Sequence, residues 1–588
     1  MPIDASAVAR VVGIETTYQD MRAGGVLFLP QRVAVLAQGS TGLVYSSTKF
    51  TALSAADVGN RMGYGSPAHL AVRQLLPING DGVGTVPVTI YPLQEAAGAA
   101  GASGDITPSG TQTQAASYRV RAGGVPSASF TIPKNATVAY IVGAMMQAIQ
   151  AVLEMPITVV PAYGAVTGAA GTNAGNGTIT ALSLTGTPRS GVWTLKLVTA
   201  VANGGVFQLL DPDGTVVNSA VTMTPGAGGT TVINTAGIQF TLTDGTSDFA
   251  VGDTFNITVP ATKLNVSTKW KGDSANAVTL SIDGTLYGVT FAFTQPTGAA
   301  GNPSVVSALA QIGNVWETIF VNCLNESDTT NLDAIQTVGE GRWGNTVRKP
   351  FVSICGQTAP LLADATAISS ARRTDRINAH VVSPGTSDLP FVVAARAVAR
   401  IASLANNSPV RDYGGQKLTG LNPGADSAQW DYPTRDAAVK LGSSTATVRD
   451  GVVVLGDVVT YYRPTGEDPP AYRYVCDIIK LQNIIYNVSL IFASDAWDGM
   501  ALVPDNQPVV SPDARKPRDA VAAVNALIDN LGLLAFLSDP ATAKKKTTGA
   551  IDSQNPKRLD VGLKVQLSGN SNVIDVALNY GFYFGAAA

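Results

Sequence analysis

RVAVLAQG, residues Arg32–Gly39, is an apolar run that ends in a glycine. Such a run predicts a strand buried on both faces and followed by a tight turn. Ser66 and Pro67 then mark the start of a short helix, because serine caps a helix N-terminus and proline fits its first turn. VPVTIYPL, Val86–Leu93, is a second buried strand. Strand, helix and strand in this order predict an α/β sheet.

The same pattern returns after residue 262 and predicts a core built from two distant parts of the chain. Residues 21–95 and 262–505 would form one α/β core, since insertions are accepted in exposed loops whose ends lie close together. Its further strands are expected at Thr318–Cys323, Lys349–Cys355, Ile377–Ser383, Thr445–Val448 and Val452–Tyr462. Its helices are expected at Ser304–Ile312, Leu361–Arg373, Leu389–Leu404, Arg435–Leu441 and about residues 472–492.

Two Gly-rich stretches delimit the expected insertions. EAAGAAGASGDITPSGTQTQ, which follows Gln94, reads as a linker with little that could form a core. A small α+β domain is predicted over residues 96–164, with a helix from about Val138 to Leu153. After the second stretch, AVTGAAGTNAGNG, only strand signals separated by Gly, Asp and Asn turns occur, which predicts a β-sandwich over residues 165–261.

Both ends of the chain have the period-two pattern of strands. In VVGIETTY, Val12, Ile14, Thr16 and Tyr18 alternate with Gly or polar residues, within an N-terminal arm of residues 1–20. A lone strand is not stable in water, so we expect both terminal ribbons to pair with a sheet of their own domain or of another protein. In the C-terminal arm, residues 571–588, the alternating apolar positions are Ile574, Val576, Leu578, Tyr580, Phe582 and Phe584.

A C-terminal domain is predicted over residues 506–570. It has an amphipathic helix at Arg518–Leu531 and a strand, LDVGLKVQL, at Leu559–Leu567. One face of that strand carries Val561, Leu563, Val565 and Leu567.

A basic tripeptide interrupts the C-terminal domain. Lys544, Lys545 and Lys546 belong to a segment with a local positive excess in a chain of net charge −3. Two interpretations stay open, a solvated loop and an electrostatic contact with an acidic partner.

The sequence contains no motif that predicts a catalytic, cofactor or metal site. The chain has only two histidines, His69 and His380, and each is expected to be structural. GxSxG, HExxH, CxxC and GxxxxGK[ST] are absent from the sequence. Cys323, Cys355 and Cys476 fit no metal or disulfide spacing and are expected to be buried thiols of a reducing compartment. We therefore expect no cofactor and no enzymatic activity.

The composition indicates which classes of partner to expect. Charged residues make up 14% of the chain, against about 25% in an ordinary soluble protein. Either much of the surface is covered by partners, or the protein is simply β-rich and poor in Lys and Glu. The net charge of −3 argues against a nucleic-acid binder, and neither a long uncharged apolar run nor a secretory signal is recognised, so membrane insertion is not expected.

Several long segments resemble the contractile tail sheath proteins of bacteriophages, and most closely their Mu-like branch. VVGIETTYQDMRAGGVLFLPQRVAVLAQG (Val11–Gly39) is similar to the start of that family. WKGDSANAVTLSI, VTFAFTQPTGAAGNPSVVSALAQIG and GEGRWG (Gly339–Gly344) are similar to its core. The segment from Leu502 through KRLDVGLKVQLSGNSNVIDVALNYGFYF resembles its C-terminal domain. The resemblance covers nearly all of the chain outside the Gly-rich insertions.

This resemblance implies a structural subunit with a split α/β core of subtilisin-like topology, which concerns the fold and not hydrolysis. Sheath subunits assemble in the bacterial cytoplasm as stacked, hexameric rings around a tail tube of the virion, and they contract to drive the tube through the host envelope. Baseplate and tail terminator proteins would be further partners.

The resemblance also assigns roles to the residues described above. The two arms would be donated to neighbouring subunits by β-augmentation, and the strand with Val561, Leu563, Val565 and Leu567 would belong to the accepting sheet. Lys544–Lys546 would face an acidic tube.

The interpretation as a phage tail sheath subunit has three rivals. A tail tube or capsid protein would be expected to lack the split α/β core. The sheath of a tailocin or related injection system shares the same ancestry. A subtilisin-like hydrolase would need a catalytic triad, which the sequence does not reveal.

Overall fold

The computed structural model describes residues 25–223, 229–466, 471–572, 576 and 578. The chain divides into two compact units. The smaller, here called the terminal unit, comprises Met1–Pro30, Leu404–Asp412 and Val475–Ala588. The larger, the main unit, comprises Gln31–Ser403 and Tyr413–Tyr474.

The main unit contains an eight-stranded sheet with the order β2-β3-β1-β20-β21-β22-β23-β24. Neighbouring strands from β3 to β23 are parallel, and the edge strands β2 and β24 are antiparallel. All residues of β1, β3, β20 and β22 are buried, as in a parallel sheet covered on both faces. The strands are β1 (Val33–Gln38), β2 (Phe50–Thr51), β3 (Val88–Leu93), β20 (Ile319–Asn322), β21 (Val352–Gln357), β22 (Asn378–Val382), β23 (Ser444–Arg449) and β24 (Val452–Leu455).

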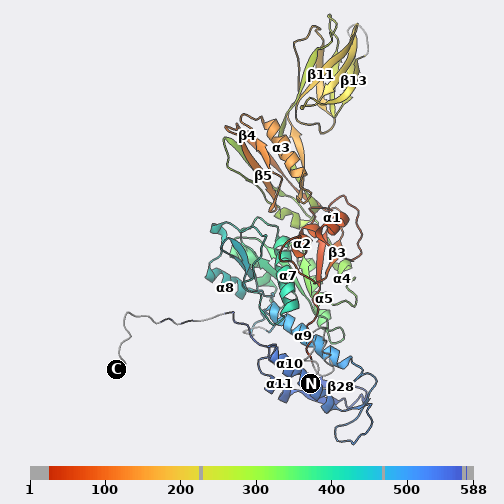
Figure 1. The fold of residues 1–588 in the computed structure, drawn as a ribbon, viewed down its shortest axis with the longest axis vertical. Helices are drawn as coiled ribbons and strands as arrows, with labels where there is room; N and C mark the ends of the chain where they lie inside the picture. The colour runs from red at the N-terminus through yellow and green to blue at the C-terminus, as the bar shows by residue number, and fades with distance from the viewer. Residues whose placement is uncertain (1–24, 224–228, 467–470, 573–575, 577, 579–588) are drawn as a thin grey trace, which may run out of the picture. The chain divides into compact units, whose positions relative to one another are not determined.

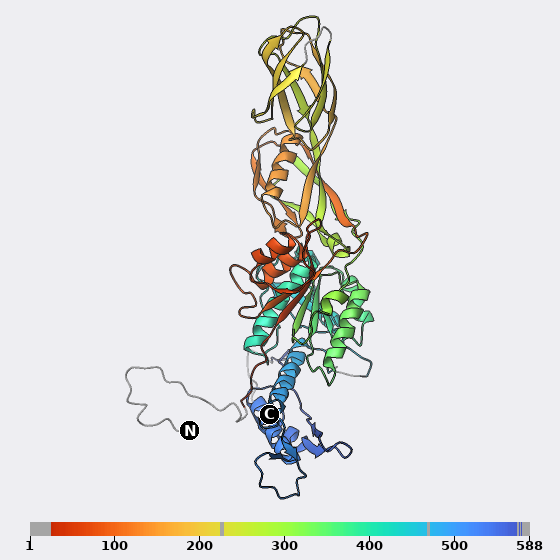
Figure 2. The same cartoon turned by 90° about the vertical axis from the view of Figure 1, so that its right-hand side faces the viewer.

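Helices lie on both sides of this sheet (Figure 2). The start of α2 is as predicted, because Ser66 Oγ accepts a hydrogen bond from the His69 amide at 3.2 Å and Pro67 lies in the first turn. The helix predicted at Ser304–Ile312 is reduced to four residues. The helices are α1 (Ala55–Met62), α2 (Pro67–Leu75), α4 (Val306–Leu309), α5 (Thr329–Trp343), α6 (Leu362–Ala371), α7 (Pro390–Asn407), α8 (Tyr432–Lys440) and the short 3₁₀ helix Asp426–Ala428.

The first inserted domain combines helix α3 with two small sheets (Figure 1). A four-stranded sheet has the order β19-β4-β17-β8, and a second sheet has the order β18-β5-β6, with β7 paired to β5. Its elements are β4 (Gly101–Gly110), β5 (Ala116–Ala122), β6 (Val125–Pro126), β7 (Phe130–Ile132), α3 (Val138–Gln150), β8 (Ile157–Tyr163), β17 (Ala261–Lys271), the 3₁₀ helix Asp273–Ala277, β18 (Leu280–Asp283) and β19 (Val289–Thr297).

Two expectations about this region are wrong. The stretch read as a linker forms β4, which pairs with β17 and β19 and buries Ala102 and Ile106. Residues 262–297 were assigned to the core, yet β17 and β19 complete the sheet of the inserted domain. The reason is that β4 offers mostly small side chains, whose burial depends on partner strands more than 150 residues away in the sequence.

The second insertion forms two antiparallel sheets around one core, as the alternating strands predict. The sheet orders are β10-β15-β14 and β13-β12-β11-β16-β9. Trp193, Phe207, Phe240 and Phe255, which come from both sheets, share one hydrophobic cluster. The strands are β9 (Thr167–Ala170), β10 (Thr178–Leu184), β11 (Gly191–Val201), β12 (Gly204–Leu210), β13 (Val216–Met223), β14 (Thr230–Thr235), β15 (Ile238–Thr243) and β16 (Thr254–Val259).

The terminal unit has its own hydrophobic core. Val524, Leu527 and Ile528 of α10 pack with Ile484 of α9 and with Phe536. Helix α9 was expected in the α/β core, but it belongs to this unit because its apolar face meets α10. The elements are α9 (Val475–Phe492), β25 (Ala501–Leu502), β26 (Ala514–Arg515), α10 (Pro517–Leu533), α11 (Pro540–Lys546), β27 (Thr548–Ile551) and β28 (Leu559–Gly562).

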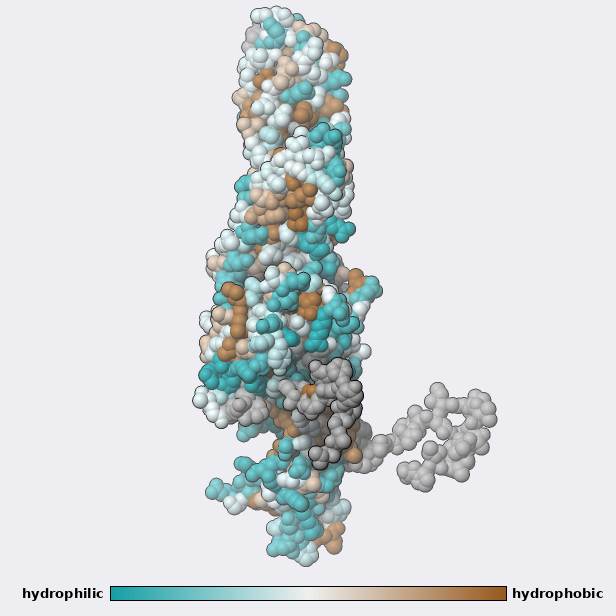
Figure 3. All heavy atoms as spheres, turned by 90° about the vertical axis from the view of Figure 1, so that its left-hand side faces the viewer, coloured by the Kyte–Doolittle hydropathy of each residue, from teal (hydrophilic) through white to brown (hydrophobic). Residues whose placement is uncertain are grey.

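Exposed apolar side chains are scattered over the described surface. On the face drawn in Figure 3, hydrophobic areas are small and separated by hydrophilic ones. Val44 and Ile78 are among the most exposed in the main unit, and Val510 and Leu533 in the terminal unit.

Candidate strand-exchange site in the terminal unit

The structure describes only part of the two predicted arms. Val12, Ile14, Thr16 and Tyr18 of the N-terminal arm lie outside the described residues, as do Ile574, Tyr580, Phe582 and Phe584 of the C-terminal arm. Val576 and Leu578 are described, and their side chains are 75% and 80% exposed. Two successive positions on the predicted apolar face of the C-terminal arm therefore have almost no cover within this chain.

The predicted accepting strand is shorter than the sequence suggests. Strand β28 pairs antiparallel with β27, from Thr548 opposite Gly562 to Ile551 opposite Leu559, and it ends at Gly562 instead of Leu567. Beyond it, burial still alternates, since Lys564 and Gln566 are exposed. The four predicted apolar residues all pack partly buried against the core of the terminal unit, namely Val561, Leu563, Val565 and Leu567.

The segment after β28 is held at its far end but has an open backbone edge. Leu567 forms a bridge with Leu537, the Ser538 amide donates to the Gln566 carbonyl at 3.1 Å, and the Ser568 amide donates to the Phe536 carbonyl at 2.9 Å. In the part of the chain that the structure describes, no strand pairs with residues 563–566. Because Ser538 already binds the Gln566 carbonyl, the open part of the backbone is residues 563–565, and a stretch of this kind, with Leu563 and Val565 on its inner face, can accept an additional strand.

The three lysines of the basic tripeptide lie on the last turn of α11 and not in a loop. Asp539 caps this helix by accepting a hydrogen bond from the Thr542 amide at 3.0 Å. Cations at a helix C-terminus interact favourably with its dipole, which gives the tripeptide a structural role. Lys544 also pairs with Asp529 at 2.6 Å, whereas Lys545 and Lys546 point to solvent as an exposed positive pair.

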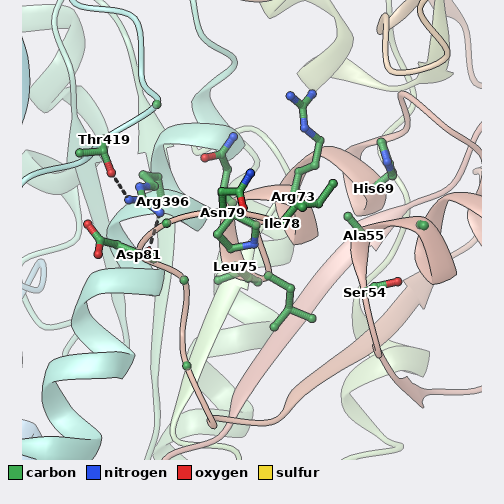
Figure 4. A pocket seen from close by; sticks show the side chains of 18 of the residues that line it. Ser54, Ala55, His69, Arg73, Leu75, Ile78, Asn79, Asp81, Arg396 and Thr419 are labelled. Atoms are coloured by element: carbon green, nitrogen blue, oxygen red, sulfur yellow. Dashed lines mark hydrogen bonds between the residues drawn. The ribbon is translucent and has the colours of Figure 1, made fainter.

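Helix α2 and the loop of residues 77–84 line a cleft of about 1270 Å³ in the main unit, together with α7 (Figure 4). Its charged groups have partners, since Arg73 pairs with Glu154 at 2.7 Å, Arg400 lies 3.7 Å from the Asp81 carboxylate, and Arg396 donates to the backbone carbonyl of Asp81 at 2.6 Å. His69 Nδ1 accepts a hydrogen bond from the Gly65 amide at 3.2 Å. Burial, followed by the charge of Arg73, lowers the pKa of His69 to about 4, so this histidine is neutral and already bonded at pH 7.

The second histidine lies in a buried cluster that the sequence did not reveal. His380 Nδ1 lies 2.7 Å from Glu326 and 3.2 Å from the hydroxyl of Tyr461, which in turn lies 3.6 Å from Cys355 Sγ. All four side chains are buried, and burial raises the pKa of the Cys355 thiol and of the Tyr461 hydroxyl. A protonated thiol without solvent access is not a nucleophile, so the cluster has the properties of a structural network.

The three cysteines have the burial that the sequence predicts. Cys323, Cys355 and Cys476 are buried and free, as predicted. Within the described ranges, no group of three or more His, Cys, Asp or Glu side chains could hold a metal ion.

No family model matches this chain. It is 23% identical over 319 residues to the Mu-like prophage FluMu tail sheath protein of Haemophilus influenzae, a match that covers 52% of this chain and 63% of that protein. The chain thus spans slightly less than two thirds of this curated relative.

The sheath tail protein of Listeria innocua has a TM-score of 0.42 at 12% identity, with 94% of this chain and 95% of that chain covered. The helical sheath of the anti-feeding prophage in its contracted state has a TM-score of 0.39 at 9% identity, with 98% and 99% covered. The curated sequence relative is itself a Mu-like tail sheath protein, which confirms the resemblance to contractile phage tail sheath proteins predicted from the sequence segments.

Proposed function

We propose that this protein is the structural subunit of a contractile phage tail sheath, which polymerises as stacked rings around a tail tube and contracts to drive the tube through the host envelope. The observation that carries the proposal is the exposed apolar face of the C-terminal arm at Val576 and Leu578, in a chain whose strand β28 runs into an unpaired segment. The relationship to a tail sheath protein supports the same role.

The arms would be exchanged between copies by β-augmentation. Each backbone hydrogen bond adds only about 0.5–1.5 kcal/mol net. Burial of the six large apolar side chains of the C-terminal arm, at about 1.5–3 kcal/mol each, gives a gross stabilisation on the order of 10 kcal/mol. Association and ordering offset much of this. Because a slip by one residue would expose the whole apolar face, the register would persist while the subunits rearrange.

The proposal includes the finer features that the family resemblance implies. The core would have the subtilisin-like topology of sheath proteins, supported by its parallel sheet between helices. Its partners would be further copies in hexameric rings, an acidic tube, and baseplate and terminator proteins, assembled in the host cytoplasm. A structural, non-enzymatic role is supported by the buried state of the His380 cluster and by the engaged polar groups of the cleft. The proposal holds equally for a complete phage and for a tailocin.

Electron microscopy of the purified, full-length recombinant protein tests this function. We expect long hollow cylinders, because the arms of each copy find their acceptors on the next. Incubation with peptide and glycan substrates should give no turnover above background. Discrete monodisperse particles that turn over such a substrate would contradict the proposal and support the hydrolase alternative.

The basic pair at the end of α11 gives a separate prediction. Lys545→Glu with Lys546→Glu should weaken co-sedimentation of the sheath protein with tail tubes by roughly tenfold, and more at low salt, because exposed charges are screened by salt. Lys544 is left unchanged, since it pairs with Asp529.

The matched control is Lys196→Glu, at an exposed position in β11 of the second insertion. Self-polymerisation should be unchanged in both variants. If the double variant binds tubes as well as the control does, the proposed tube contact is contradicted and the proposed arm exchange is unaffected.

A further inference from the structure

Helix α9 is apolar overall, yet several of its buried side chains are polar. By length and hydropathy it could cross a membrane. Yet Lys480, Asn483 and Asn487 are almost completely buried in the terminal unit. The spacing of three and four residues places them along one face of the helix. Buried polar groups of this kind need partners, so their partners show what this face does.

Two of these residues hold the chain that follows the N-terminal arm. Asn487 binds both backbone groups of Leu27: its Oδ1 accepts from the Leu27 amide at 2.9 Å and its Nδ2 donates to the Leu27 carbonyl at 2.8 Å. Asn483 Oδ1 accepts from the Leu29 amide at 2.8 Å. Side-chain amides thus replace the backbone partners that a neighbouring strand would supply. Phe28, between the two, packs its ring 6.2 Å from that of Phe536.

The third residue holds the chain that precedes the C-terminal arm. Lys480 Nζ donates to the Ser568 carbonyl at 2.6 Å and to Asn570 Oδ1 at 2.6 Å. Its charge is balanced by Asp477 at 2.9 Å. Asn570 is fixed further, because its Nδ2 donates to the Val410 carbonyl at 2.9 Å.

We infer that this face of α9 is a common anchor for the roots of both arms, that is, for residues 27–29 and residues 568–570. The inference rests on the proposed exchange of arms between subunits. Lys480 and Asn487 are about 10 Å apart along the helix axis, at 1.5 Å per residue. Tension that one neighbour applies to the N-terminal arm therefore reaches the C-terminal arm through two turns of one helix. The terminal unit thereby acts as a junction that passes this load from one arm to the other.

Hydrogen exchange on the soluble chain tests the anchor directly. Asn487→Ala should raise exchange of the Leu27 amide at least tenfold, and Asn483→Ala that of Leu29, without affecting residues 568–572. Lys480→Met, which keeps the length of the side chain, should loosen residues 568–572 alone. Ser489→Ala is the control, because Ser489 Oγ donates only to the Ile485 carbonyl of its own helix.

Tubes assembled from these variants test whether the anchor carries load between the two arms. Tubes of the Asn483→Ala/Asn487→Ala variant and of Lys480→Met should form, then break into short pieces in urea that leaves wild-type and Ser489→Ala tubes intact. If Lys480→Met does not fold, Asn570→Ala removes the bond between Lys480 and Asn570 from the other side, together with the bond from Asn570 to the Val410 carbonyl, and leaves the sequence of the helix unchanged.

The results distinguish the anchor, the junction and the proposed sheath function from one another. Unchanged exchange at the roots in folded variants would overturn the anchor. Loosened roots with fully resistant tubes would overturn the junction. A wild-type chain that never forms tubes would contradict the proposed sheath function, while the exchange measurements would still decide on the anchor.

Discussion

Removal of Asn572–Ala588 should leave a soluble chain that no longer forms tubes. The deletion takes away the whole apolar ribbon, whose exposed members Val576 and Leu578 find no cover in the isolated chain. Because gross burial on the order of 10 kcal/mol per arm is lost, we expect the concentration needed for polymerisation to rise by at least about a thousandfold. Sedimentation and electron microscopy of the truncated chain measure this.

A matched pair of single substitutions tests whether polymerisation depends on the apolar face of the arm or only on the presence of the arm. In the alternating pattern, Leu578 lies on the apolar face and Asn579 on the other. Leu578→Asp should therefore abolish polymerisation, since it would bury an unpaired carboxylate, whereas Asn579→Asp should polymerise normally. Tubes of normal length from the truncated chain would contradict the arm assignment, and equal effects of the two substitutions would contradict its register.

Gly356→Ala should unfold the main unit under conditions in which the wild type is stable. Gly356 lies in β21, in the middle of the eight-stranded sheet, and a Cβ there would overlap the carbonyl oxygen of Pro390, where α7 begins. That oxygen belongs to the backbone, so relief requires the sheet and the helix to move apart. We expect a loss of about 3–5 kcal/mol in the free energy of unfolding.

Gly341→Ala is the control for this substitution. Gly341 lies exposed in α5, and a Cβ there would meet nothing within 4 Å. Because alanine is a better helix former than glycine, it should stabilise the protein by about 0.5–1 kcal/mol. Urea unfolding followed by circular dichroism compares the two variants. Equal midpoints would mean that the close contact between β21 and α7 is not what requires a glycine.

Local sequence predicted those elements whose signals lie within the element itself. The apolar runs at β1 and β3, the Ser66–Pro67 helix start and the strands β23 and β24 are present in the structure. Helix α5 was missed because it contains glycines and β-branched residues that form helices poorly. Its Gly339 is needed for packing, since a Cβ there would lie 2.5 Å from Ile377. That requirement depends on a residue of another element.

By itself, the sequence determined the parallel-sheet core and the alternating strands of the second insertion, because hydrophobic periodicity acts over neighbouring residues. Only the tertiary structure decided that β4 belongs to a sheet with β17, that His380 meets Tyr461, and that Asn487 holds Leu27. These partners lie 81 to 460 residues apart, and a polar or small side chain carries no local signal of which distant group will satisfy it. The free energy of such contacts appears only when folding has brought both partners together and removed water from them.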